Sequence, residues 1–88
     1  MSRRPDVVVY TRATCGLCRS AEAIVAREAR RAEVRHVDID GDDDLQAAYN
    51  IRVPVVTVDG VEVAEGQVVP GVVRAAVRRA RRNRGPVR

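Results

Sequence analysis

The two cysteines of the sequence lie in one short motif, Cys15-Gly16-Leu17-Cys18. A C-x-x-C motif beside a strand–helix–strand pattern is typical of redox sites in which two thiols alternate with a disulfide. A thiolate at a helix N-terminus is stabilised by free backbone N–H groups, which lower its pKa from ~8.5 to ~3.5–7.5. We therefore expect Cys15, at the helix N-terminus, to attack a substrate disulfide. Cys18, one turn further on, is expected to resolve the mixed disulfide.

The same two thiols could serve other purposes. A structural disulfide that closes so small a loop would add little stability, and such bonds are rare in a reducing compartment. A zinc ion needs about four ligands, whereas one chain offers its two cysteines and His36. A metal ion or iron–sulfur cluster would therefore need two chains, or small thiols as further ligands. A non-catalytic carrier of this kind is the alternative function; within one chain we predict no metal site and no cofactor.

The motif is expected to lie among four strands. Residues 6–10 and 55–58 are β-branched runs without polar alternation, as in strands that are buried on both faces. Residues 34–39 alternate between apolar and polar side chains, which is typical of a half-exposed edge strand. Asp59-Gly60 is a strong signal for a two-residue turn, so residues 61–64 should return antiparallel to 55–58.

Three amphipathic segments are predicted to be helices. The first begins at Leu17, the second follows the aspartates at 42–44 and ends at Asn50 as a left-handed cap, and the third opens near Pro70. The expected inward residues are Leu17, Ala21, Ile24, Val25 and Ala29, then Leu45, Ala48 and Tyr49, and finally Val73, Ala76, Val77 and Ala80. The order β-α-β-α-β-β-α predicts an α/β fold, with a four-stranded mixed sheet covered by three helices.

We assign residues 6–82 to this domain, residues 1–5 to an N-terminal arm and residues 83–88 to an Arg-rich tail. All sixteen basic residues are Arg; residues 1–73 hold nine of them and all twelve acids, whereas residues 74–88 hold seven and no acid. We interpret the C-terminal arginines as a solvated helix face, with docking to RNA, an acidic protein or anionic lipid as the alternative.

The composition also limits the classes of partner that we expect. Tyr10 and Tyr49 are the only aromatic residues, which argues against the base stacking of a specific nucleic-acid reader. No apolar run reaches the ~18 residues of a membrane span, and the three valines after Asp6 are too few for the core of a signal peptide. We therefore expect a monomeric cytoplasmic protein with no membrane partner.

The residues around the cysteines carry a family resemblance. Tyr10-Thr11-Arg12-Ala13-Thr14 followed by C-x-x-C resembles the glutaredoxin signature, in which a strand ends in Tyr and a basic residue and Thr precede the first Cys. The likeness continues at residues 37–40, in Tyr49-Asn50-Ile51-Arg52-Val53-Pro54 and in the turn at 59–60, so that it covers residues 6–80. The chain is most similar to the small bacterial glutaredoxin-like proteins. This resemblance implies a thioredoxin fold and a dithiol oxidoreductase that reduces disulfides of proteins or small molecules.

The resemblance also implies how a substrate is held. The Val53-Pro54 bond is expected to be cis, with Pro54 against the two cysteines and the backbone before it paired with the substrate. Arg12 is expected to lie near the Cys15 thiolate. The predicted substrate-binding residues are thus Arg12, Arg52, Val53, Pro54, Glu65 and Gly66.

Two departures from the glutaredoxin pattern bear on the reductant. Gly16-Leu17 stands where glutaredoxins have Pro-Tyr, and Glu65-Gly66 stands where they have a glycine pair that approaches glutathione. Glu65 adds bulk and a charge of the same sign as the γ-glutamyl carboxylate, and Arg52 could offset part of that repulsion. Of the two candidate reductants, we expect a thioredoxin-type system to serve better than glutathione.

Overall fold

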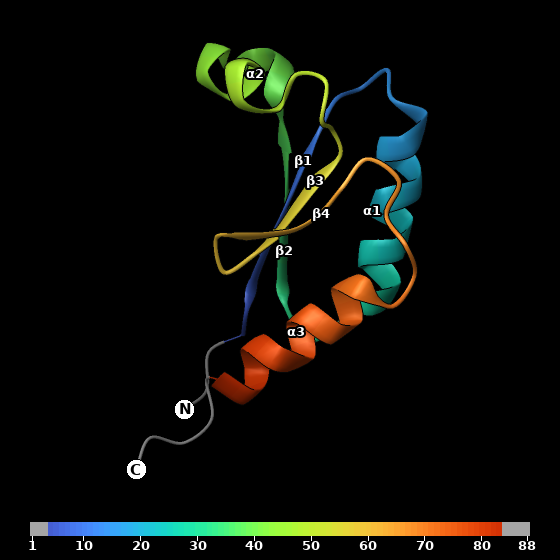
Figure 1. Ribbon diagram of the computed structural model, residues 1–88, viewed down its shortest axis with the longest axis vertical. Coiled ribbons are helices and arrows are strands. Elements are labelled where there is room, and N and C mark those ends of the chain that lie inside the picture. The colour runs from blue at the N-terminus through green and yellow to red at the C-terminus, as the bar shows by residue number, and fades with distance from the viewer. Residues whose placement is uncertain (1–3, 84–88) are drawn as a thin grey trace.

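The computed structural model describes residues 4–83 and contains the predicted elements in the predicted order (Figure 1). The strands are β1 (Asp6–Thr11), β2 (Glu33–Asp38), β3 (Val55–Val58) and β4 (Val61–Glu65). The helices are α1 (Gly16–Glu28), α2 (Asp43–Tyr49) and α3 (Val72–Asn83), with a 3-10 turn, Ile39–Gly41, between β2 and α2. Of the predicted arm and tail, residues 1–3 and 84–88 lie outside the described residues.

The four strands form one mixed sheet in the order β2-β1-β3-β4. β1 runs parallel to β2 and antiparallel to β3, and β3 and β4 form an antiparallel hairpin. The register places Val9 beside Val56 and Tyr10 beside Val55. Because successive side chains point to opposite faces, the first pair lies on one face of the sheet and the second pair on the other. β2 is an edge strand, as predicted, and the central β1 leads directly into the cysteine motif.

One face of the sheet packs against α1 and α3 (Figure 1). Its core is built from small aliphatic side chains, among them Val7, Val9, Val56 and Val58 of the sheet, Ala21, Val25 and Ala29 on the α1 side, and Val73, Ala76 and Val77 of α3. Burial of each valine side chain contributes about 1.5–3 kcal/mol. The predicted inner stripe of α3 is confirmed. The inward position of Leu17 is wrong, because the first turn of α1 leaves 47% of that residue exposed beside the cysteines.

The opposite face of the sheet carries two buried valines, Val8 and Val55, beside Tyr10. Tyr10 stacks on Tyr49 of α2, with the ring centroids 4.4 Å apart. The expected inward position of Ala48 is wrong, since Ala48 is exposed and the short α2 buries none of its residues fully. The left-handed cap at Asn50 is also wrong: its φ of −48° and ψ of −52° are right-handed helical. The chain turns there because the N–H groups of Arg52 and Val53 both donate to the carbonyl of Tyr49.

A carboxylate from another helix fixes the N-terminus of α3. The buried Glu28, the last residue of α1, accepts hydrogen bonds from the backbone N–H groups of Gly71 (2.7 Å) and Arg74 (3.1 Å). These N–H groups have no partner within the helix, and a negative charge is favourable at this end of the helix dipole. Glu28 of α1 therefore caps the N-terminus of α3. The helix begins two residues after Pro70.

The long axis of the molecule separates two regions (Figure 1). The cysteine end consists of the loop after β1, the first turns of α1, and residues 38–54 with α2. The α3 end consists of α3 and the C-terminal end of α1. Within residues 4–83, no helix combines the length and the apolar character that crossing a bilayer requires.

Candidate functional site

Cys15 and Cys18 lie at the N-terminus of α1, just after the loop that follows β1. Cys15 is the N-cap residue, with an extended backbone (φ −136°, ψ 109°), and Cys18 lies in the first turn. Their sulfurs are joined in a disulfide, and their Cα atoms are 5.2 Å apart. Cys15 is partly exposed, whereas Cys18 is fully buried. The two sulfurs therefore differ in their access to a partner.

The start of α1 directs a backbone donor at the more exposed sulfur. The N–H group of Cys18 donates to Cys15 Sγ over 3.1 Å, and the carbonyl of Cys15 accepts from the N–H group of Arg19. After reduction, the same donor and the helix dipole would stabilise a thiolate at Cys15. The space beside Gly16 is open and Leu17 is exposed, so a partner can approach the motif from this side.

Arg19 and Glu22 hold the loop that leads into Cys15. The Arg19 guanidinium donates to Thr11 Oγ1 (3.0 Å), to the Arg12 carbonyl (3.0 Å) and to the Glu22 carboxylate (2.7 Å). Thr11 Oγ1 donates in turn to Glu22 (2.7 Å). These contacts tie the end of β1 to α1 and so position Cys15. Sequence reasoning missed both residues because they lie on the outer side of the helical stripe; their i,i+3 spacing was the available signal.

Arg12 joins three segments at the cysteine end. Its guanidinium donates to the Asp40 carboxylate at 2.9 and 3.0 Å, and to the side-chain and backbone oxygens of Asn50 at 2.8 and 3.1 Å. The loop before Cys15 is thereby bonded to the 3-10 turn and to the end of α2. Within residues 4–83, the guanidinium donates its hydrogen bonds to Asp40 and Asn50 alone, so its interaction with a Cys15 thiolate stays a prediction.

The Val53-Pro54 bond is cis, as the resemblance implied. Pro54 is fully buried, and its carbonyl accepts a 2.8 Å hydrogen bond from the N–H group of Gly66. Gly66 has a φ of 68°, a left-handed conformation that glycine adopts without steric cost. Val53, Pro54 and Gly66 therefore lie together where β3 begins and β4 ends. Contact of Pro54 with the cysteines, and pairing of Val53 with a substrate, stay predictions.

Arg52 is bonded to two carboxylates of β4. It donates to Glu65 at 2.9 and 3.2 Å and forms a close ion pair with Glu62. The guanidinium carbon also lies 5.4 Å from the centre of the Tyr49 ring. Its hydrogen bonds to Glu65 and then to Glu62 raise the pKa of Arg52 above its already high ordinary value. Two predicted substrate-binding residues, Arg52 and Glu65, are thus bonded to each other.

Comparison with known proteins identifies the family. Residues 6–78 match the family model described as Glutaredoxin-like domain (DUF836). The chain belongs to this family. The X-ray structure of the structural-genomics target protein XcR50 from X. campestris is similar with a TM-score of 0.71 and 32% identity, over 83% of this chain and 96% of that one. Protein Ne2328 from Nitrosomonas europaea is similar with a TM-score of 0.61 and 28% identity, over 88% of this chain and 95% of that one.

A thioredoxin shares the fold of this glutaredoxin-like chain. A mutant thioredoxin from Halobacterium salinarum has a TM-score of 0.69 at 24% identity, over 90% of this chain and 76% of that one. The predicted thioredoxin-like α/β fold is therefore confirmed. No curated protein matches the sequence. A glutaredoxin-like fold that pairs its two cysteines at the start of α1 supports a redox role for the dithiol.

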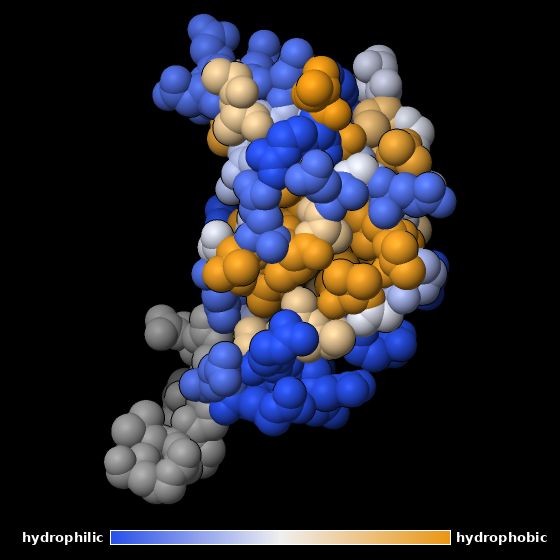
Figure 2. Space-filling view, in the orientation of Figure 1, coloured by the Kyte–Doolittle hydropathy of each residue, from blue (hydrophilic) through white to orange (hydrophobic). Residues whose placement is uncertain are grey.

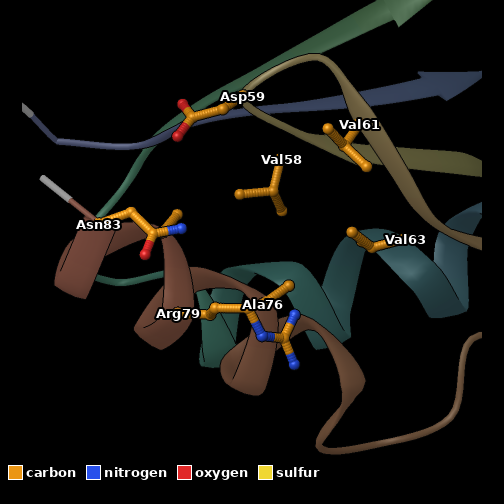
Figure 3. Close-up of a pocket in the computed structure, with 8 residues that line it drawn as sticks. Val58, Asp59, Val61, Val63, Ala76, Arg79 and Asn83 are labelled. Carbon is orange, nitrogen blue, oxygen red and sulfur yellow. The ribbon is translucent and has the colours of Figure 1, made fainter.

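A pocket lies away from the cysteines. It is a pocket between the β3–β4 hairpin and α3, with a mostly aliphatic lining and with Asp59, Arg79 and Asn83 at its polar positions (Figure 3). The predicted site residues do not line this pocket. Within residues 4–83, no three His, Cys, Asp or Glu side chains are arranged to hold a metal ion. The dithiol therefore lies apart from the pocket, on the partly exposed surface at the cysteine end.

Proposed function

We propose that this protein is a dithiol–disulfide oxidoreductase that reduces disulfides of proteins or small molecules. The observation that carries the proposal is the unequal exposure of two paired sulfurs in the first turn of one helix. Cys15, the partly exposed N-cap residue, is suited to attack, and the buried Cys18 is suited to resolve. The fold agrees with this assignment, because the chain belongs to a glutaredoxin-like family.

In the first step, the Cys15 thiolate attacks one sulfur of the substrate disulfide. The other substrate sulfur leaves as a thiolate and takes a proton from solvent. Cys18 then loses its proton and attacks Cys15 Sγ, which forms the Cys15–Cys18 disulfide and releases the second substrate thiol. The substrate gains two electrons and two protons, and the protein dithiol loses them. A thiol reductant restores the dithiol by the reverse exchange.

The cycle needs a supply of reducing equivalents, so we place the protein in the cytoplasm, as a monomer in electron transport that maintains redox homeostasis. Its proposed partners are a disulfide-containing protein and a reductant of the glutathione or thioredoxin type. Neither a membrane nor a specific nucleic acid takes part in this proposal.

Separate serine variants of the two cysteines test the proposal. Cys15→Ser should abolish disulfide reduction, whereas Cys18→Ser should accumulate a mixed disulfide through Cys15, visible by intact mass. Each variant is the matched control for the other, since both remove one sulfur from the same turn. Faster labelling of Cys18 than of Cys15 by iodoacetamide, at a mildly acidic pH where only a low-pKa thiol reacts, would contradict the assignment. Visible absorbance after anaerobic reconstitution with iron and sulfide, together with dimer formation, would favour the carrier function instead.

A further inference from the structure

The cysteine end and the adjoining part of β4 carry far more acidic than basic side chains. The carboxylates are Glu22, Asp38, Asp40, Asp42, Asp43, Asp44, Glu62 and Glu65, and the arginines are Arg12, Arg19 and Arg52. Figure 2 shows hydrophilic side chains gathered over α2 at this end, above an apolar band across the middle of the molecule. At neutral pH this region is negative, although the formal charge of the whole chain is +4.

Each of the three arginines there is already bonded to a carboxylate of its own chain. Arg12 pairs with Asp40 at 2.9 Å, Arg19 with Glu22 at 2.7 Å, and Arg52 with Glu65 at 2.9 Å. Such charge-assisted hydrogen bonds occupy the guanidinium donors that an incoming carboxylate would need. An anionic ligand would therefore have to displace a carboxylate of the protein before it could bind either Arg12 or Arg52.

The remaining aspartates around α2 add negative charge that is not neutralised by ion pairs within the described residues. Asp38, Asp42, Asp43 and Asp44 form no ion pair with any residue of the described part of the chain. Asp38 and Asp42 accept hydrogen bonds from the backbone N–H groups of Asp40 and Leu45, which leaves their charge in place. Summed charge of one sign attracts partners of the opposite sign and slows the approach of like-charged ones.

From these charges we infer that the disulfides which react at Cys15 are neutral or cationic around the scissile bond. The inference rests on the proposed function, because it names the substrate class of the same dithiol. Asp40 and Glu65 determine this selectivity. Because they are bonded to Arg12 and Arg52, an anionic disulfide cannot pair with these arginines, and their own negative charge repels it. Selectivity here comes from an unfavourable interaction with the wrong partner as much as from attraction to the right one.

Three small disulfides of different charge test the inference in single turnovers of the pre-reduced protein. The probes are cystamine (cationic), hydroxyethyl disulfide (neutral) and oxidised glutathione (anionic). Each reaction is followed by acid quench, alkylation and intact mass. Its rate is divided by the rate at which dithiothreitol reduces the same probe, which corrects for differences in intrinsic reactivity among the three disulfides. The normalised rate with cystamine should exceed that with oxidised glutathione by about tenfold or more, as electrostatic steering allows. The ratio should shrink as salt is added.

Charge-removing variants assign the effect to the named pairs. Asp40→Asn combined with Glu65→Gln should raise the normalised rate with oxidised glutathione several-fold, because both arginines lose a carboxylate partner. Glu33→Gln is the matched control, since it also removes carboxylate charge but lies at the start of β2, beside Arg4; it should leave the ratio unchanged.

The possible outcomes separate this inference from the proposed function. Reaction with all three probes at equal normalised rates, or a ratio that the double variant does not move, would overturn the charge selectivity and leave the oxidoreductase activity standing. A failure of every probe to react would overturn both.

Discussion

The cysteine end and the α3 end of this molecule both carry many arginines, but they use them differently. At the cysteine end, Arg12, Arg19 and Arg52 are each bonded to carboxylates and to backbone oxygens of neighbouring segments. At the α3 end, the helix carries five arginines, all exposed, and none of them forms an ion pair within residues 4–83: Arg74, Arg78, Arg79, Arg81 and Arg82. The α3 helix is held instead by buried valines and by Glu28.

The difference shows that stability and site geometry are separable in this fold. Burial of aliphatic groups is non-directional and contributes most of the folding free energy. Partly exposed ion pairs contribute little free energy, but they fix the direction of a loop or a side chain. Substitutions at the α3 end should therefore change the free energy of unfolding, whereas substitutions at the cysteine end should change reactivity and selectivity.

The largest expected effect is at the α3 end, where Val73 is fully buried. Val73→Ala should lower the free energy of unfolding by about 2 kcal/mol, through lost burial and the cavity that remains. Val72→Ala, on the same helix but with Val72 38% exposed, is the matched control and should change it by less than about 0.5 kcal/mol. Urea unfolding followed by circular dichroism measures both. Equal losses in the two variants would contradict the core as described.

Removal of the Glu28 carboxylate should have the next largest effect. Glu28→Ala leaves the N–H groups of Gly71 and Arg74 without their partner, which should cost about 1–2 kcal/mol of unfolding free energy, as loss of a helix cap does. Glu28→Gln keeps an acceptor oxygen and should recover part of the loss. Hydrogen exchange at the first turn of α3 should quicken in the alanine variant. Unchanged exchange there would show that the cap does not hold this helix.

The cysteine end should behave in the opposite way. A double-mutant cycle of Arg12→Ala and Asp40→Ala should give a coupling free energy of only about 0.2–1 kcal/mol, because both side chains are partly exposed. The rate of Cys15 alkylation should nevertheless change in both single variants, since the loop before Cys15 loses its tie to the 3-10 turn. A large coupling free energy with an unchanged alkylation rate would contradict this comparison, because the cysteine end would then set stability rather than reactivity.

The contrast between aliphatic burial and individual ion pairs also explains what could be predicted from the sequence. Val9, Val56 and Val73 belong to apolar runs or stripes whose period fixes both the element and its buried face, so the sheet, the α3 stripe and the element order were predictable. The cis bond before Pro54 followed from the family resemblance. The pairing of Arg12 with Asp40, and of Glu28 with α3, was not predictable, because each joins residues at least 28 positions apart. Such contacts depend on tertiary placement, and charge alone does not select one carboxylate among twelve.

The smallest predicted effect concerns the tyrosine stack at the cysteine end. Burial raises the pKa of Tyr49, Tyr10 and Glu62 add to the rise, and Arg52 opposes it. In a Tyr10→Phe variant, Tyr49 is the only phenol, so phenolate absorbance near 295 nm reports it alone. Because burial is the largest cause, the midpoint of the Tyr49 titration should still lie above the ordinary value of about 10.

The raised pKa of Tyr49 also makes stability depend on pH. The unfolded chain would ionise first, so the stability contributed by neutral Tyr49 is complete below about pH 10 and is lost as the pH rises through the raised folded-state pKa. A midpoint at or below the ordinary value, in protein that is still folded by circular dichroism, would show that the folded protein does not bury this ring.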